Sequence, residues 1–115
     1  MEPNMPVIDK NFIGAFTNGY NAMVAEASIP EASWYPCGFA YLCIKVRKNS
    51  KLAHPLLQCG FRWNDYNKEY RYGMPHELKL QGMTQSMDYA ERCLNAIVKK
   101  LEPLELTCYV HTHID

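Results

Sequence analysis

Several features that mark common protein classes are missing from this sequence. Its 115 residues contain no apolar run near the roughly 20 residues that a membrane-spanning helix needs. They also contain no basic and apolar leader of the kind that directs secretion. The 12 basic and 12 acidic side chains cancel, so no net charge favours nucleic acid or an anionic membrane. We therefore expect a cytoplasmic protein that does not enter a membrane.

Motifs of common catalytic and cofactor sites are also missing. The sequence contains no nucleophile elbow, P-loop, H-E-x-x-H or G-x-G-x-x-G pattern. Its five cysteines form no C-x-x-C pair, which excludes the usual zinc-knuckle and thioredoxin signatures. Because an odd number of cysteines fits a disulfide framework poorly, we expect all five thiols to be free in a reducing compartment. We expect no cofactor, and we favour a binding protein over an enzyme.

The chain does have enough apolar sequence for a folded domain. Apolar residues make up 48% of the sequence and aromatic residues 12%, which argues against disorder. A chain of this length usually forms one domain that buries about two-thirds of its unfolded surface. We therefore expect a single domain over residues 1–115, in which residues 1–8, with two prolines, form a loose N-terminal lead-in.

Two segments have the apolar spacing of three and four residues that is typical of amphipathic helices. The first helix is predicted over residues 9–27, with Asp9 as its N-cap. The second is predicted over residues 84–101, where Thr84 or Ser86 could act as the N-cap. These helices would bury their apolar sides against the same core.

Alternation of apolar and polar residues predicts the strands. One strand is expected over residues 39–47, a hairpin over residues 61–72 and a last strand over residues 104–114. Residues 51–59 are ambiguous, and their leucines favour a short helix although Pro55 would lie inside it. This order predicts an α+β fold, in which a mostly antiparallel sheet of three to four strands packs against the two main helices.

Aromatic and basic side chains alternate along the predicted hairpin. The candidate partner-binding residues there are Arg62, Trp63, Tyr66, Lys68, Tyr70 and Arg71. Such side chains dominate protein–protein contacts, and they also form stacking platforms for single-stranded nucleic acid. Asp65 and Glu69 dilute the positive charge, so we favour a protein partner and keep nucleic acid as the alternative.

His111, His113 and Asp115 share one face of the last predicted strand at a spacing of two residues. Imidazole and carboxylate groups in this pattern could bind a divalent metal, most easily two of them with a ligand from elsewhere. The candidates for that further ligand are His54, His76 and Glu91. A metal-dependent hydrolase is therefore a further alternative, although a solvated strand face without metal explains the same pattern.

Two parts of the sequence resemble nucleic-acid-binding families. Thr17-Asn18-Gly19, Ala90-Glu91 and Thr112-His113 resemble the segments that carry metal-binding carboxylates in RNase H-like domains. Of those carboxylates only Glu91 is kept, and the resemblance requires a strand over residues 12–18. Residues 86–101 resemble the last helix of double-stranded RNA-binding domains, which share the order helix, three strands, helix. Met87 and Asp88 replace the basic residues that usually open that helix, and here a strand follows it.

A third resemblance, of general pattern, covers the chain from residue 34 to its end. Cys37-Gly38-Phe39-Ala40, Gln85-Ser86-Met87 and an end at Asp115 after a polar strand resemble small phage-encoded proteins of uncharacterised function. This resemblance implies a viral accessory or host-takeover role and brings no catalytic residue. The sequence thus predicts a small non-enzymatic protein that binds or inhibits a host protein in the host cytoplasm. A nucleic-acid or nucleotide-binding module is the alternative.

Overall fold

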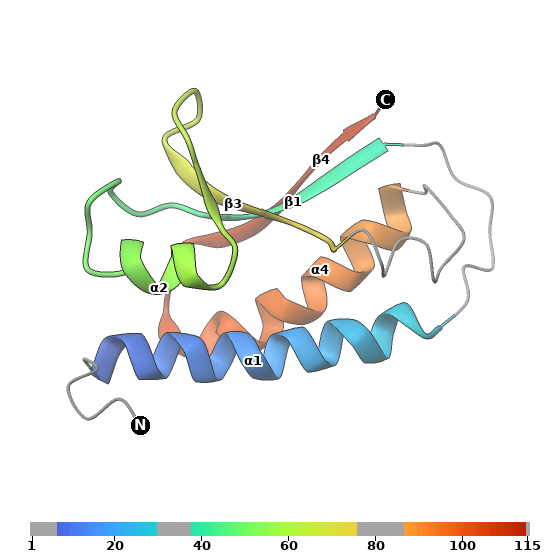
Figure 1. Cartoon of the computed structure of the whole chain (residues 1–115). Coiled ribbons are helices and arrows are strands. Elements are labelled where there is room, and N and C mark those ends of the chain that lie inside the picture. The colour runs from blue at the N-terminus through green and yellow to red at the C-terminus, as the bar shows by residue number, and fades with distance from the viewer. Residues whose placement is uncertain (1–6, 30–37, 76–86, 115) are drawn as a thin grey trace.

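The computed structural model describes residues 7–29, 38–75 and 87–114 of the chain (Figure 1). Along these ranges the elements are α1 (Val7–Ala27), β1 (Gly38–Ile44), α2 (Ala53–Gln58), β2 (Arg62–Asn64), β3 (Glu69–Gly73), α4 (Met87–Leu101), the 3-10 turn η1 (Glu102–Leu104) and β4 (Cys108–Ile114). The predicted α+β class is confirmed, with a four-stranded antiparallel sheet and two main helices. No helix within these ranges is long and apolar enough to cross a bilayer.

The strands form one antiparallel sheet in the order β2-β3-β1-β4. β2 and β3 make the predicted hairpin, in which Trp63 lies opposite Tyr70. β1 lies inside the sheet, where Leu42 has Tyr72 on one side and Val110 on the other. The last strand of the described ranges therefore pairs with the first, and neither strand of the hairpin pairs with it.

The helices α1 and α4 pack against each other and lie on one side of the sheet (Figure 1). From α1, Phe12 and Phe16 meet Phe61 with ring centroids 6.1 and 5.6 Å apart. From α4, Leu94 and Ile97 point into the same core and have no exposed surface. This apolar core between helices and sheet determines which face of each strand is left for other contacts.

Strand alternation follows the predicted pattern. In β1, Ala40 and Leu42 are buried among the helices, whereas Tyr41 between them points to the opposite face. In β4, Val110 packs against the core, and His111 is exposed on the other face. The two faces of the sheet are therefore chemically distinct, apolar toward the helices and polar on the other side.

Two predicted ends of elements are wrong. α1 begins at Val7, so Asp9 lies inside the helix and does not act as its N-cap. The preference of certain residues for the N-cap position locates the start of a helix only to within one or two residues, which explains the error. β1 ends at Ile44 instead of residue 47, since β3 begins at Glu69, opposite Lys45, and residues 46 and 47 therefore have no partner strand on that side.

The last strand is also shorter than predicted. It begins at Cys108, because Leu104 belongs to the turn η1 and Glu105 has a left-handed φ of 58° that breaks the extended chain. Residues 51–59 do contain a helix, α2, as the leucines favoured. The predicted caps Thr84 and Ser86 lie outside the described residues.

Residues 12–18, which the RNase H-like resemblance requires as a strand, lie within α1. The helical spacing of their apolar side chains explains this, because Phe12 and Phe16 occupy one side of the helix and enter the core. The resemblance to RNase H-like domains therefore does not extend to the fold.

Candidate functional site

One face of the sheet is covered by helices, and we call the other the open face. Among the described residues, the side chains that the strand register places on the open face are Tyr41, Cys43, Arg62, Asn64, Glu69, Arg71, Tyr109, His111 and His113. No helix of the described ranges lies over them (Figure 1). All four strands contribute to this surface, so its composition depends on the strand order.

Glu69 binds several of the polar side chains on the open face. It is charged, yet it has no exposed surface. Arg71 Nε donates a hydrogen bond to Glu69 Oε2 at 2.7 Å, and the Tyr109 hydroxyl donates to Oε1. Lys45 Nζ lies 3.8 Å from Oε1. The carboxylate thus connects β3 to the segment after β1 and to β4, three pieces far apart in the sequence.

The protonation states follow from these contacts. Burial by itself raises the pKa of Glu69, but hydrogen bonds from Tyr109, Arg71 and Cys43 outweigh it and hold this pKa below its ordinary value of 4.5. The hydrogen bond to Glu69 raises the pKa of Tyr109. Burial, reinforced by Glu69, raises the pKa of the Cys43 thiol to about 11. At neutral pH the carboxylate is ionised, and neither neighbour is an activated nucleophile.

Arg71 is fixed on several sides. Besides Glu69, its Nη2 donates to Asn67 Oδ1 at 2.8 Å. Its guanidinium carbon lies 5.5 Å from the centre of the Tyr41 ring, within the range of a cation–π contact. The guanidinium therefore has one defined orientation on the open face.

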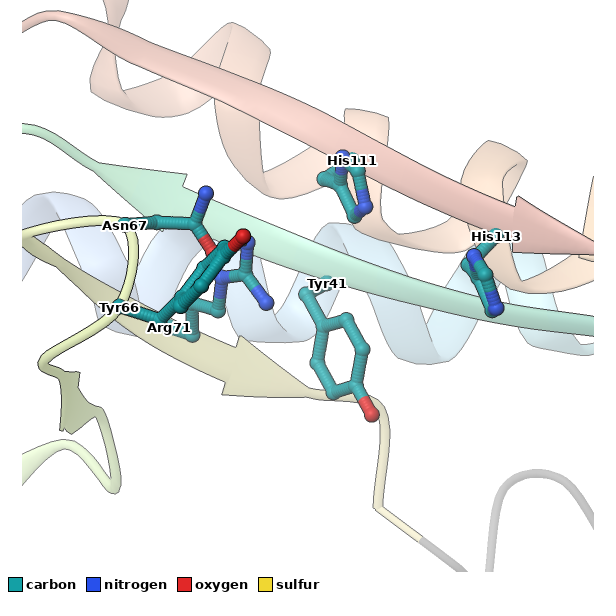
Figure 2. Close-up of a pocket in the computed structure, with 6 residues that line it drawn as sticks. All are labelled: Tyr41, Tyr66, Asn67, Arg71, His111 and His113. Carbon is teal, nitrogen blue, oxygen red and sulfur yellow. The ribbon is translucent and has the colours of Figure 1, made fainter.

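A shallow hollow of about 370 Å³ lies beside Arg71, and we call it the open-face hollow. It is lined by Tyr41, Tyr66, Asn67, Arg71, His111 and His113. Figure 2 shows these side chains gathered on the same side of the sheet, from β1, β3, β4 and the turn after β2. Tyr66 is 93% exposed, which is unusual for a side chain of its size. The open-face hollow is therefore an aromatic and polar surface with one arginine.

The six hairpin residues predicted to bind a partner divide between the two faces. Arg62, Tyr66 and Lys68 are exposed, and Arg71 is half-buried beside the hollow. Tyr70 is only 2% exposed, and its hydroxyl donates to the Lys48 carbonyl on the helix side of the sheet. Burial therefore removes the Tyr70 ring from the candidate contact surface.

Trp63 shares the inner face with Tyr70. Their ring centroids are 5.1 Å apart, and Trp63 is half-buried against the core. Its indole N–H donates to Asp65 Oδ1 at 3.3 Å. The indole is thus a packing group that offers a partner only part of its surface, because strand alternation turns it toward the helices.

His111 and His113 both line the open-face hollow, as their shared strand face predicts. Their proposed companions Asp115 and His76 lie outside the described residues. His54 and Glu91 lie on α2 and α4. Within the described ranges, no group of three His, Cys, Asp or Glu side chains is placed to hold a metal. The described residues therefore supply no set of metal ligands for the alternative of a metal-dependent hydrolase.

Sequence reasoning missed several residues of the site. Glu69 was expected only to dilute positive charge, and Tyr41, Asn67 and Tyr109 were not candidates. The opposite charges of Glu69 and Arg71 at a spacing of two on one strand could have indicated their ion pair. No local pattern could have indicated Tyr109, which lies 40 residues from Glu69 along the chain.

Comparison of the chain with known protein families, with curated proteins and with solved structures finds no match. The function must therefore be inferred from the open face itself. Its geometry offers an anchored arginine, exposed tyrosine and histidine side chains, and a shallow hollow. No group with the pKa of an activated nucleophile occurs among Cys43, Tyr109 and Glu69.

Proposed function

We propose that this chain is a binding module that holds a partner protein against the open face of its sheet. The observation that carries the proposal is the open-face hollow, with the exposed Tyr66 ring beside an arginine that Glu69 anchors. The resemblance to small phage-encoded proteins makes a host protein the first partner to test. Inhibition of that partner would follow if the surface it uses for its own function is covered.

The hollow has the properties of a contact surface that needs little ordering on binding. Arg71 is already oriented by Glu69 and Asn67, so it loses little conformational freedom when a partner docks. Tyrosine supplies a large contact area with only two rotatable side-chain bonds, which supports a role for Tyr66. Tyrosine and arginine are also, with tryptophan, the residues enriched at energetic hot spots of protein interfaces.

The charges around the hollow favour a protein partner over nucleic acid. Most basic side chains of this surface face a carboxylate: Arg71 lies 2.7 Å and Lys45 3.8 Å from Glu69. Lys68 lies 3.2 Å from Asp65. Nucleic-acid binding depends on several cations that neutralise phosphates, and here the neighbouring carboxylates already neutralise them. Trp63 and Tyr70, which stacking on bases would use, are turned toward the helices.

The proposal is tested by a double change of Arg62 and Tyr66 to Ala. The matched control is Tyr20→Ala, which removes another exposed tyrosine but from α1 on the helix side. Immobilised proteins capture partners from an extract of the host, and the affinity of each captured protein is then measured. We expect the double variant to lose about thirtyfold or more in affinity, the effect of about 2 kcal/mol at a hot spot.

The same variants decide between the two partner classes. A fluorescent single-stranded DNA and RNA of mixed sequence serve as nucleic-acid probes in a salt titration. We expect weak binding with a shallow salt dependence. Tight oligonucleotide binding with a steep salt dependence, lost in the double variant, would replace the protein-binding proposal by the nucleic-acid alternative. Equal partner affinity for wild type and a folded double variant would refute the use of this surface.

A further inference from the structure

β4 forms one edge of the sheet, and within the described ranges no strand pairs with its outer side. Edge strands are usually protected from pairing by short length, charged side chains, proline or bulges. The opposite edge strand, β2, is three residues long and carries Arg62. β4 is seven residues long, and its sequence CYVHTHI contains no Asp, Glu, Lys, Arg, Pro or Gly. By these criteria the β4 edge is open to pairing.

The backbone groups that face outward can be identified from the register. The Lys45 N–H donates to the Thr107 carbonyl at 3.0 Å, so these two residues form a hydrogen-bonded pair. In an antiparallel ladder, residues bonded to the neighbour alternate with residues whose N–H and C=O point to the other side. The outward set in β4 is therefore Cys108, Val110 and Thr112. Their donors and acceptors are arranged to bind another extended strand.

We propose that this strand comes from a second copy of the chain, with β4 pairing antiparallel to β4 about a two-fold axis. Such a pairing is isologous: each copy uses the same residues, and the contact closes at a dimer. Because β4 contains no Asp, Glu, Lys or Arg, no like charges of this strand face each other across the pairing. The pairing would satisfy the outward backbone groups of both copies at once.

In each copy α4 lies over β1 and β4, at the edge that would pair, and α1 packs against α4. A two-fold axis perpendicular to the sheet keeps the helices of both copies on one side. Both open-face hollows then lie on one continuous surface, with His111 and His113 of each copy near the axis. The dimer itself does not depend on the proposed function.

The first test is the oligomeric state of the purified chain by sedimentation over a wide concentration range. We expect a dimer for the wild type. Thr112→Pro removes an outward N–H and leaves the bonds to β1 in place, so it should weaken the dimer at least about tenfold. Thr112→Val keeps the N–H and serves as the matched control, which should dimerise like the wild type. Circular dichroism of each variant checks that it is folded.

A second test places opposite charges across the proposed contact and does not depend on a proline substitution. The alternation of outward-facing residues in β4 allows the two-fold axis to pass through Val110 or through His111. In either register, the His111 side chains of the two copies lie directly or diagonally opposite each other, close enough to interact. We expect His111→Lys and His111→Glu each to weaken self-association, and a mixture of the two to restore dimers. A monomeric wild type would overturn the proposal. A wild-type dimer that neither Thr112→Pro nor the charge variants weaken would also overturn it, because another surface would then hold the copies together.

Discussion

Glu69 illustrates how a single residue organises the polar face of this protein. Its neighbour Tyr70 points into the core, and strand alternation turns Glu69 to the opposite face. There the carboxylate is covered by the side chains that bind it, those of Arg71, Tyr109 and Lys45. A buried charge is tolerated only when it is paired and hydrogen-bonded, and this cluster meets that condition.

We predict that Glu69→Gln destabilises the fold by about 1–3 kcal/mol, because the neutral amide loses the charge that pairs with Arg71 and keeps only one of the two oxygens that accept from Arg71 and Tyr109. Only one layer of side chains separates the carboxylate from solvent, so we do not expect the larger loss of a deeply buried pair. The midpoint of urea unfolding measures the change. Asp65→Asn is the control, because Asp65 is 79% exposed and its ion pair with Lys68 contributes little.

The same carboxylate predicts a dependence of stability on pH. The pKa of Glu69 is lowered on folding, so its stabilising contribution is complete above its ordinary pKa of 4.5 and is lost as the pH falls through the lower folded value. The urea concentration at the unfolding midpoint should therefore decrease once the pH is lowered below about 4.5. In Glu69→Gln this part of the decline should be smaller, and parallel curves for the two proteins would contradict the assignment.

At the scale of elements, the contact between α1 and α4 depends on a glycine. A Cβ at Gly19 would lie 3.0 Å from both the Cα and Cγ2 atoms of Ile97, a closer approach than packed carbon atoms normally make. Gly14, five residues earlier in α1, has open space around the same position. Glycine weakens a helix at both sites, but only Gly19 allows the two helices to come close together.

This difference makes the two glycines a matched pair of substitutions. Gly14→Ala should stabilise the protein by up to about 1 kcal/mol, the usual gain of alanine over glycine in a helix. Gly19→Ala should instead destabilise it by about 1–3 kcal/mol, because the added methyl group must displace the α4 backbone. Thermal unfolding followed by circular dichroism measures both. Equal stabilisation by both changes would show that the helices do not meet at Gly19.

α2 shows where element prediction from sequence is weak. Pro55 argued against a helix over residues 51–59, yet α2 begins at Ala53 and contains it. The first N–H groups of a helix have no acceptor within the helix, so a proline at the third position removes no bond. The helix is then held by tertiary packing, since Leu56 has no exposed surface in the core.

At the scale of the whole molecule, the apolar core determines the state of the cysteines. Cys43, Cys59 and Cys108 are free thiols, and burial raises their pKa values to about 11, 11 and 12. We predict that these three react slowly with a thiol reagent in the native protein at neutral pH, because the thiolate is scarce. In denaturant under non-reducing conditions, all five cysteines of the chain should react. Recovery of three or fewer thiols would contradict the expectation of a reducing compartment.

The sequence alone determined the fold class and the helix-facing side of each long element. Periodicity is a local property, and residues such as Leu94 and Val110 reveal it without any knowledge of their partners. The strand order β2-β3-β1-β4 was decided only in the tertiary structure, because pairing of β1 with β4 joins segments some 70 residues apart. The composition of the open face therefore also depends on the strand order, because Glu69 and Tyr109 meet only where their strands, β3 and β4, flank β1. Local patterns therefore predicted which side chains leave the core, and packing across the whole chain decided which of them meet.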